Sequence, residues 1–274
     1  MILRMSPEPT PKLPPKPDKR GQRHDELLTV ARDVLIRSGL AGFSIDQVAK
    51  LAGYSRPTVY SHFGSKDEVL DALARKNLEM GVGLIEKAKK FEGTAREQSF
   101  ALVLGYEVMA RFYPEEFHVT ELLGMRWVRE SLPSSTAGAF ASMVQSFYAA
   151  LLEQIERAVE EGELELREGM TKGNVVFHSL AMANGIYSSI IKERIILRLS
   201  DPSEPWAEAR AALQCYWDGI GWKAADTDVD YAEVADRFLK ESFPELWLKL
   251  EVEKLKRESG LSTGIDAGVG LLAE

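Results

Sequence analysis

The sequence predicts an all-α fold, with a small N-terminal domain of three helices followed by a larger helical domain. Two observations support this fold class. Apolar residues recur with the spacing of helix faces from about residue 22 to residue 258, and no segment has the pattern of a β-hairpin. Helix-capping residues, glycines and prolines then divide this long pattern into separate helices.

The chain should begin with a disordered arm at residues 1–19, which hold six of the 12 prolines. The first helix is expected from about residue 22 to residue 38. One face of this helix carries Leu27, Val30, Ala31, Val34 and Leu35, and Gly39 follows the helix.

A second, short helix is expected to begin at Ile45. Ser44 can cap it and Gln47 can complete a capping box, because the two residues are three positions apart. Gly53 stands where the helix should end in a left-handed turn.

A third helix is expected after that turn, with Ser55 as its cap and Pro57 in its first turn. Val59 and Phe63 should face inward. The outward face is then polar and rich in hydrogen-bonding groups, and it carries Arg56, Thr58, Tyr60 and His62. A tight helix-turn-helix with such an outer face fits the major groove of DNA.

These residues resemble the tetracycline-repressor (TetR) family of bacterial transcription regulators. The resemblance covers about residues 22 to 78 and departs from the family at Arg56 and Pro57, where the family often has a small residue or glycine. The matching residues are Phe43, Ser44, Ile45, Val48, Ala49, Ala52, Gly53, Tyr54, Ser55, Thr58, Val59, Tyr60, His62, Phe63, Ser65, Lys66, Asp67, Glu68 and Leu70.

The resemblance implies that residues 20–78 bind double-stranded DNA. Arg56 and Thr58, with Ser55 beside them, would then contact base edges. Phosphate contacts would come from Ser44, Tyr60, His62 and Lys66. Arg20 and Arg23 would reach phosphate or the minor groove, although the arm before them is expected to be an unstructured tail.

The C-terminal region, residues 79–258, is expected to be helical throughout. One long helix should open after Ser65 with a second capping box to Glu68 and reach about Lys90, and Gly81 and Gly83 are positions at which it can bend. The segment from Phe100 to Tyr113 is apolar on almost every side, so its helix should be central. The expected helices are 95–112, 115–130, 135–161, 171–199, 205–222, 229–241 and 244–258, and a flexible tail should follow at 259–274.

Wide apolar side chains gather in this helical region. Each can be plain core packing, but together they can also line a cavity for an apolar or amphipathic ligand. The resemblance favours a cavity and an unidentified small-molecule effector. The side chains expected to line it are Tyr106, Met109, Phe112, Trp127, Phe147, Phe177 and Met182.

The two helices at 171–199 and 205–222 carry small residues that allow close helix approach. The resemblance implies that they join two copies into a homodimer, so that two recognition helices meet the half-sites of a near-palindromic operator. Packing within one chain is the alternative. The residues after 222 would either cover the bundle or extend this interface.

The balance of charges agrees with a DNA-binding N-terminal domain. Residues 1–78 hold 13 Lys and Arg against nine Asp and Glu, whereas the whole chain has a net charge of −8. A single cysteine, Cys215, and the absence of a long apolar segment favour a cytoplasmic protein without a membrane span.

The sequence offers little for catalysis. Glu115 and His118 have the spacing of one half of a di-iron site, but a second such pair is missing, and Cys215 has no histidine near it in sequence. We therefore expect no enzyme activity, metal or cofactor, and predict a ligand-responsive DNA-binding regulator, most often a repressor in this family. The alternatives are an effector-independent DNA-binding regulator whose helical body serves dimerisation or protein partners, and a helical enzyme that carries a helix-turn-helix.

Overall fold

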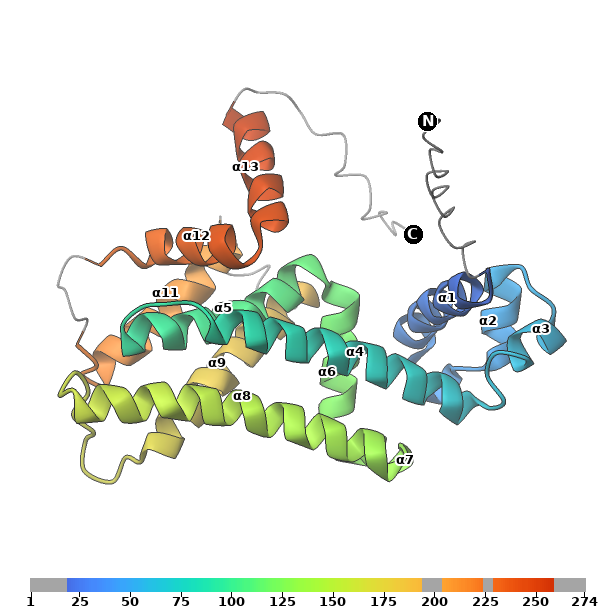
Figure 1. Ribbon diagram of the computed structural model, residues 1–274, viewed down its shortest axis with the longest axis horizontal. Helices are drawn as coiled ribbons and strands as arrows, with labels where there is room; N and C mark the ends of the chain where they lie inside the picture. Colours follow the sequence, from blue (N-terminus) through green and yellow to red (C-terminus); the bar gives the residue numbers. More distant parts are fainter. Residues whose placement is uncertain (1–18, 194–203, 224–228, 259–274) are drawn as a thin grey trace, which may run out of the picture. The chain divides into compact units, whose positions relative to one another are not determined.

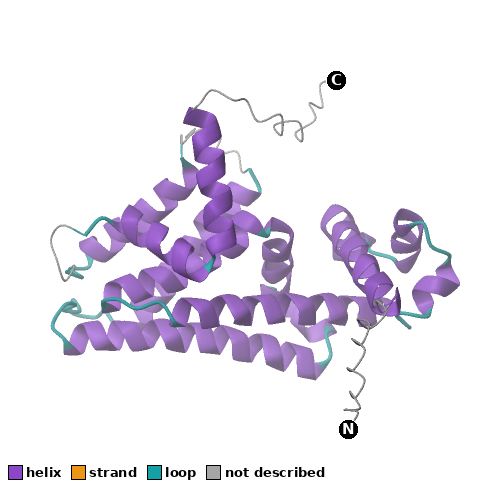
Figure 2. Ribbon diagram, turned by 45° about the horizontal axis from the view of Figure 1, so that its top comes forward, coloured by secondary structure: helices purple, strands orange, loops and turns teal. Residues whose placement is uncertain are grey.

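The computed structural model describes residues 19–193, 204–223 and 229–258, and these residues are helical, with short connections (Figure 1, Figure 2). They contain no β-strand, and the only extended pairing among them is an isolated bridge between Leu164 and Trp222. The all-α prediction is confirmed. The arm before Lys19 and the tail after Glu258 lie outside the described residues.

The chain forms two compact units, Met1–Leu73 and Ala74–Glu274. The first unit contains three helices and the first turns of a fourth. These helices are α1 (Lys19–Gly42), α2 (Ile45–Ala52), α3 (Arg56–Tyr60) and α4 (Lys66–Lys89).

Helix α1 is longer than the expected helix but breaks where the sequence indicates. Gly39 has φ 64°, a left-handed conformation that glycine adopts readily, and one further turn follows it. The buried residues Leu27, Leu28, Ala31, Val34 and Leu35 form the inner face of α1. This face supports α2 and thereby fixes the helix-turn-helix.

The second unit contains the later turns of α4 and eight further helices in its described part. They are α5 (Ala95–Phe112), α6 (Pro114–Gly124), α7 (Arg126–Ser131), α8 (Ser134–Glu160), α9 (Lys172–Ile191), α11 (Pro205–Gly219), α12 (Tyr231–Ser242) and α13 (Pro244–Glu258). The single helix expected at 115–130 is two helices, because the backbone is extended at Met125.

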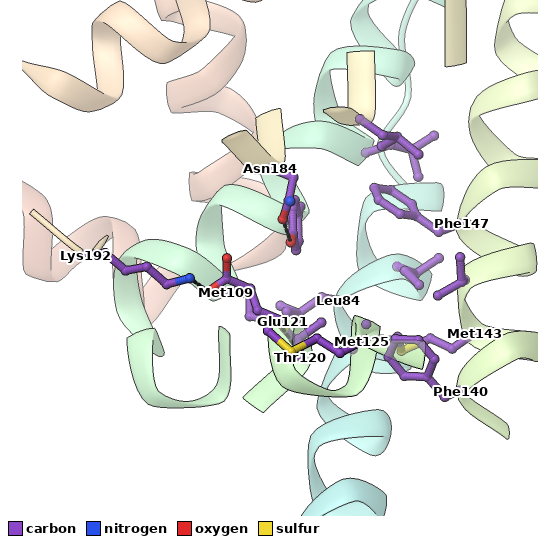
Figure 3. Close-up of a pocket in the computed structure, with 18 residues that line it drawn as sticks. Leu84, Met109, Thr120, Glu121, Met125, Phe140, Met143, Phe147, Asn184 and Lys192 are labelled. Atoms are coloured by element: carbon purple, nitrogen blue, oxygen red, sulfur yellow. Dashed lines mark hydrogen bonds and ion pairs between the residues drawn. The ribbon is translucent and has the colours of Figure 1, made fainter. Parts of the chain in front are cut away.

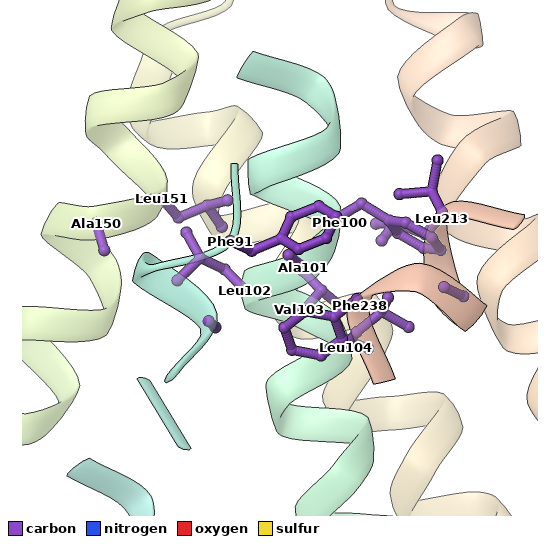
Figure 4. Close-up of a cluster of buried hydrophobic side chains, with 14 of the residues drawn as sticks. Phe91, Phe100, Ala101, Leu102, Val103, Leu104, Ala150, Leu151, Leu213 and Phe238 are labelled. Atoms are coloured by element: carbon purple, nitrogen blue, oxygen red, sulfur yellow. The ribbon is translucent and has the colours of Figure 1, made fainter. Parts of the chain in front are cut away.

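Helix α5 is the centre of this unit, as its apolar sequence predicts. Phe100, Ala101, Leu102, Val103 and Leu104 are all buried, and α5 packs against α6, α8, α9 and α12 (Figure 4). Five consecutive buried residues cannot lie on one helix face, so neighbours must surround the helix.

Helix α5 also carries a buried carboxylate that ties it to α11. Glu107 is 3% exposed and accepts two hydrogen bonds from Arg210, at 2.5 and 2.9 Å. Arg111, one turn farther along α5, lies 3.9 Å from the same carboxylate. Two positive guanidinium groups therefore lie beside this buried carboxylate.

Helix α4 continues through both Gly81 and Gly83 as one uninterrupted helix. Gly81 has a different use. A Cβ atom built on it would lie 2.6 Å from Sδ of Met143, so glycine permits the close approach of α8. Gly83 faces open space.

Candidate functional site

The turn between α2 and α3 has the geometry that the sequence predicts. Ser44 Oγ accepts the Gln47 N–H at 3.3 Å, while Gln47 Oε1 accepts the Ser44 N–H at 3.1 Å. Gly53 has φ 70° and ends α2, and Ser55 Oγ then accepts the Thr58 N–H at 3.3 Å. The capping box thus fixes the start of α2, while the turn at Gly53 and the Ser55 cap fix the start of α3 to the end of α2.

Helix α3 presents most of its surface to solvent. Val59 is its one buried residue, whereas the Arg56 side chain is 68% exposed and Tyr60 is 49% exposed. Thr58 and His62 are half-buried at the margins. Because Val59 is its one buried side chain, α3 presents a polar surface to solvent.

Arg56 already has a partner on the neighbouring helix. Its Nη2 lies 2.7 Å from Oδ2 of Asp46, at the start of α2. Both side chains are well exposed, so this ion pair contributes little to folding stability and can open at low cost. Sequence spacing alone does not indicate this pair, because the two residues lie on different helices.

Lys66 contacts the end of α1. Its ammonium group donates to the Leu40 carbonyl at 2.8 Å and lies 5.7 Å from the centre of the Phe43 ring.

The expected capping box at the start of α4 is shifted by one residue. Ser65 accepts the Glu68 N–H, but Glu68 accepts from Gly64 rather than from Ser65.

Basic groups from α1 gather around His62. The His24 and His62 rings are 5.9 Å apart. Burial, and then the nearby charges of His24, Arg20 and Arg23, lower the pKa of His62. Arg23 also lies over the Tyr54 ring, at 5.3 Å. The start of α1 and the end of α3 thus bring several basic side chains together.

The second unit contains a cavity of about 560 Å³ (Figure 3). Its wall is mostly apolar and comes from α4, α5, α6, α8 and α9. The lining residues are Gly81, Leu84, Ile85, Leu102, Gly105, Tyr106, Met109, Thr120, Glu121, Gly124, Met125, Phe140, Met143, Val144, Phe147, Leu180, Asn184 and Lys192.

Polar groups are concentrated on one side of this cavity. Lys192 Nζ lies 2.9 Å from Oε2 of Glu121, and Tyr106 donates to Asn184 Oδ1 at 2.7 Å. Phe140, Met143 and Phe147 lie on the opposite side in the view of Figure 3. Burial, and then the charge of Glu121, raise the pKa of Tyr106, so its hydroxyl remains a neutral donor. The cavity has one polar and one apolar side.

Three of the expected ligand residues, Tyr106, Met109 and Phe147, lie on the cavity wall. The other four do not, and the expectation for them is corrected. Trp127 is 56% exposed on α7 and Phe177 is 64% exposed on α9, so both face solvent. Phe112 and Met182 are half-buried and absent from the lining. Helical spacing indicates which apolar residues share a face of a helix. It does not indicate whether that face lines the cavity.

The polar residues of the cavity were missed by the sequence analysis. Glu121 and Lys192 are ordinary charged residues of helices in sequence, 71 positions apart, and Asn184 lies in a run of small residues. They come together because α6 and α9 both pack against α5. No short-range signal in the sequence could have identified them.

Within the described ranges, no three His, Cys, Asp or Glu side chains are placed to hold a metal ion. His118 lies on α6, where burial and then Lys192 lower its pKa. Cys215 is exposed on α11. In the same part of the chain, no helix has both the length and the apolar character to cross a membrane.

The fold and this site define a helix-turn-helix protein with an appended helical domain. Residues 27–73 match the model for bacterial regulatory proteins of the tetR family. This similarity lies within the first unit, Met1–Leu73.

A curated relative and two solved structures give the extent of the similarity. The HTH-type transcriptional activator FasR of Mycolicibacterium smegmatis is 30% identical over 84 residues, which are 31% of this chain and 38% of FasR. A tetR-family regulatory protein from Rhodococcus RHA1 aligns with a TM-score of 0.59 at 14% identity, over 76% of this chain and all of that one. FadR from Bacillus subtilis, in complex with stearoyl-CoA, aligns with a TM-score of 0.52 at 15% identity, over 72% of this chain and 99% of that one.

Proposed function

We propose that this protein is a DNA-binding transcription regulator that holds a near-palindromic operator as a homodimer and is released by a small apolar or amphipathic effector. One observation carries the proposal: α3 is anchored by Val59 alone and exposes Arg56 and Tyr60. Most of the surface of this capped helix is therefore left to solvent.

The division of roles follows the chemistry of the side chains. Arg56, with Thr58 and Ser55 beside it, reads base edges, because a guanidinium can bind guanine through two hydrogen bonds. Phosphates are held from two sides of α3. The residues that hold them are Ser44, Tyr60, His62, Lys66, Arg20 and Arg23.

The homodimer is supported by a face of the C-terminal unit. Ala181 and Gly185 of α9 are exposed, as are Ala207, Ala211 and Cys215 of α11. Helices α9 and α11 pack against each other, so these residues belong to one two-helix layer. Small side chains let a second such layer approach closely, and Phe177 would be covered by it.

The effector is proposed to occupy the cavity with its polar end at Lys192 and Glu121. Helix α4 contributes Gly81, Leu84 and Ile85 to the wall, and the same helix begins at Lys66 in the helix-turn-helix unit. An effector that prefers one placement of α4 would thus shift the DNA-binding population. The FadR structure in complex with stearoyl-CoA shows this fold with an amphipathic ligand.

The first test is selection of genomic DNA by the purified protein, followed by gel shift on the recovered fragments. We expect a near-palindromic site bound by two chains. Arg56→Ala should lose discrimination among sites, and Lys50→Ala serves as the matched control because Lys50 is an exposed cation of α2. Recovery of random fragments by the wild-type protein would contradict the proposal.

The effector is tested by thermal shift against a panel of metabolites, because a ligand of the folded state raises the melting temperature. Lys192→Met should weaken an acidic effector and Glu121→Gln a basic one. If no compound in a broad panel alters either the melting temperature or operator binding, the effector-independent regulator becomes the better explanation.

A further inference from the structure

The last helix, α13, has one face on the protein body and one in solvent. Leu246, Trp247 and Leu250 pack against the core, and Trp247 Nε1 donates to Asp236 Oδ1 of α12 at 2.7 Å. On the other face Leu248, Val252 and Leu255 are 58%, 42% and 60% exposed. In both ribbon views α13 stands out from α12 (Figure 1, Figure 2). An apolar stripe therefore runs along the outer side of the helix.

The spacing of this stripe is that of a coiled coil. Leu248, Val252 and Leu255 are four and three residues apart, which corresponds to heptad positions d, a and d. A β-branched residue at a with leucine at d favours a pair of parallel helices over larger assemblies. The partner that fits the stripe is thus a second helix of the same pattern.

The charges beside the stripe select both the partner and its direction. Lys249 and Lys256 occupy e positions, and Glu251 occupies the g position between them. In a parallel pair each g residue faces the e residue five positions later on the other helix, so Glu251 of each copy meets Lys256 of the other. An antiparallel pair would place like charges together.

We propose that α13 pairs in parallel with α13 of a second copy of this chain. Two heptads are too few to hold two free chains together, so the pairing needs copies already joined elsewhere. It therefore rests on the homodimer of the proposed function. Its effect is to join the C-terminal ends of the two subunits.

The test is disulfide formation in the full-length protein with Cys215→Ser as background. Leu248→Cys and Leu255→Cys are prepared separately and oxidised under mild conditions. Each should form a covalent dimer at least about tenfold faster than Lys254→Cys, which is exposed at position c and points away from the a and d positions of the stripe. Light scattering on the same samples reports the non-covalent dimer, and circular dichroism reports folding.

The outcomes separate the pairing from the dimer. A dimer by scattering in which Leu248→Cys links no faster than Lys254→Cys overturns the α13 pairing and leaves the proposed dimer intact. A monomer by scattering overturns the dimer itself. Crosslinks only in a mixture of the Leu248→Cys and Leu255→Cys proteins would show antiparallel helices and overturn the parallel arrangement.

A charge exchange tests the selection of direction. Glu251→Lys, added to the Leu248→Cys protein, should slow the crosslink severalfold, because it places lysine opposite lysine. Adding Lys256→Glu should restore the rate, since the attractive pairs return with reversed signs. If the protein with both Glu251→Lys and Lys256→Glu does not regain the crosslinking rate, these charges do not determine the direction of pairing.

Discussion

Arg56 of α3 and Asp46 of α2 form an ion pair, with Nη2 and Oδ2 2.7 Å apart, on the surface proposed to meet DNA. The pair has a direct consequence for recognition. While Asp46 holds the guanidinium, Arg56 cannot offer both of its hydrogen-bonding edges to guanine. Binding to a base therefore requires this contact to loosen or to share its donors.

Replacing Asp46 with Asn should strengthen DNA binding several-fold, because it removes both a competitor for Arg56 and a negative charge near phosphate. The melting temperature should change little, since exposed ion pairs contribute at most about 1 kcal/mol. Fluorescence anisotropy with the selected operator measures the affinity. Asp67→Asn is the control, an equal charge change at the start of α4. Weaker binding by Asp46→Asn would mean that Asp46 orients Arg56 instead of competing for it.

Truncating Arg56 to Ala should cost about 1–3 kcal/mol of discrimination at the base pair it reads, with a smaller loss on unrelated DNA. The measurement is a set of operators in which each base pair is changed in turn, titrated against both proteins. An even loss over all operator variants would assign Arg56 to phosphate.

Lys66→Ala should weaken binding to every sequence and make the slope of log affinity against log salt shallower by roughly 0.9 for each subunit. The lysine also donates to the Leu40 carbonyl, so a modest loss of stability is expected as well. Tyr60→Phe, which keeps the ring, should weaken binding without changing the salt slope. A salt slope unaltered in Lys66→Ala would exclude a phosphate contact for this residue.

The pH dependence of binding should identify His62. Burial and the neighbouring positive charges lower its pKa below the ordinary 6.5, and a bound phosphate would raise it again. The complex would then take up a proton, so binding should strengthen, by less than about tenfold, as the pH falls from 8 to 6. His62→Gln should flatten this profile, whereas His118→Gln in the other unit should not. Equal profiles for wild type and His62→Gln would show that no phosphate lies against His62.

The same shift has the opposite sign for folding. Since the unfolded chain binds a proton on His62 at a higher pH than the folded chain does, acid favours unfolding. The free energy of unfolding should decline as the pH falls through 6.5 and should decline less in His62→Gln. Chemical denaturation at pH 7.5 and pH 5.5 measures the difference.

The helix-turn-helix could be predicted from sequence because its determinants are local. Ser44 and Gln47, or Gly53 and Ser55, act within one turn of helix, and each residue type is suited to its position. The identity of the buried residue Val59 follows from the same short pattern. Prediction at this range needs no knowledge of tertiary structure.

The cavity could be predicted only in outline, because its residues come together through long-range packing. An apolar helix at Phe100–Tyr113 indicates a core, but a core and a cavity wall have the same composition. Thus the composition predicts Phe177 on the cavity wall, whereas its side chain is exposed to solvent. Nothing in the sequence singles out Glu121 and Lys192, which form an ion pair at the cavity. Similarly, Gly81 suggested a bend and instead permits close packing.

Removing the buried carboxylate of α5 should be costly. In Glu107→Ala, Arg210 loses the partner of both its hydrogen bonds while remaining largely buried, and the expected loss is about 3–5 kcal/mol. Glu130→Ala is the control, because the Arg126–Glu130 pair is exposed and should contribute less than about 1 kcal/mol. Urea denaturation followed by circular dichroism compares the two. If Glu107→Ala and Glu130→Ala both lost little stability, the Arg210 side chain would become solvated when Glu107 is removed.

Adding one methyl group at Gly81 should alter the cavity while the fold is retained. The new Cβ in Gly81→Ala would lie 2.6 Å from Sδ of Met143, and because that side chain is flexible it can turn away. Both residues line the cavity, so its shape changes, and binding of an amphipathic naphthalene sulfonate dye should weaken by roughly tenfold. Gly83→Ala, on the same helix but facing open space, should leave dye binding unchanged and gain about 0.5–1 kcal/mol of stability from its helix propensity. Met143→Ala combined with Gly81→Ala should recover dye binding, since the obstructing sulfur is gone. If the Gly81 and Gly83 variants bound the dye equally well, the dye would not occupy this cavity.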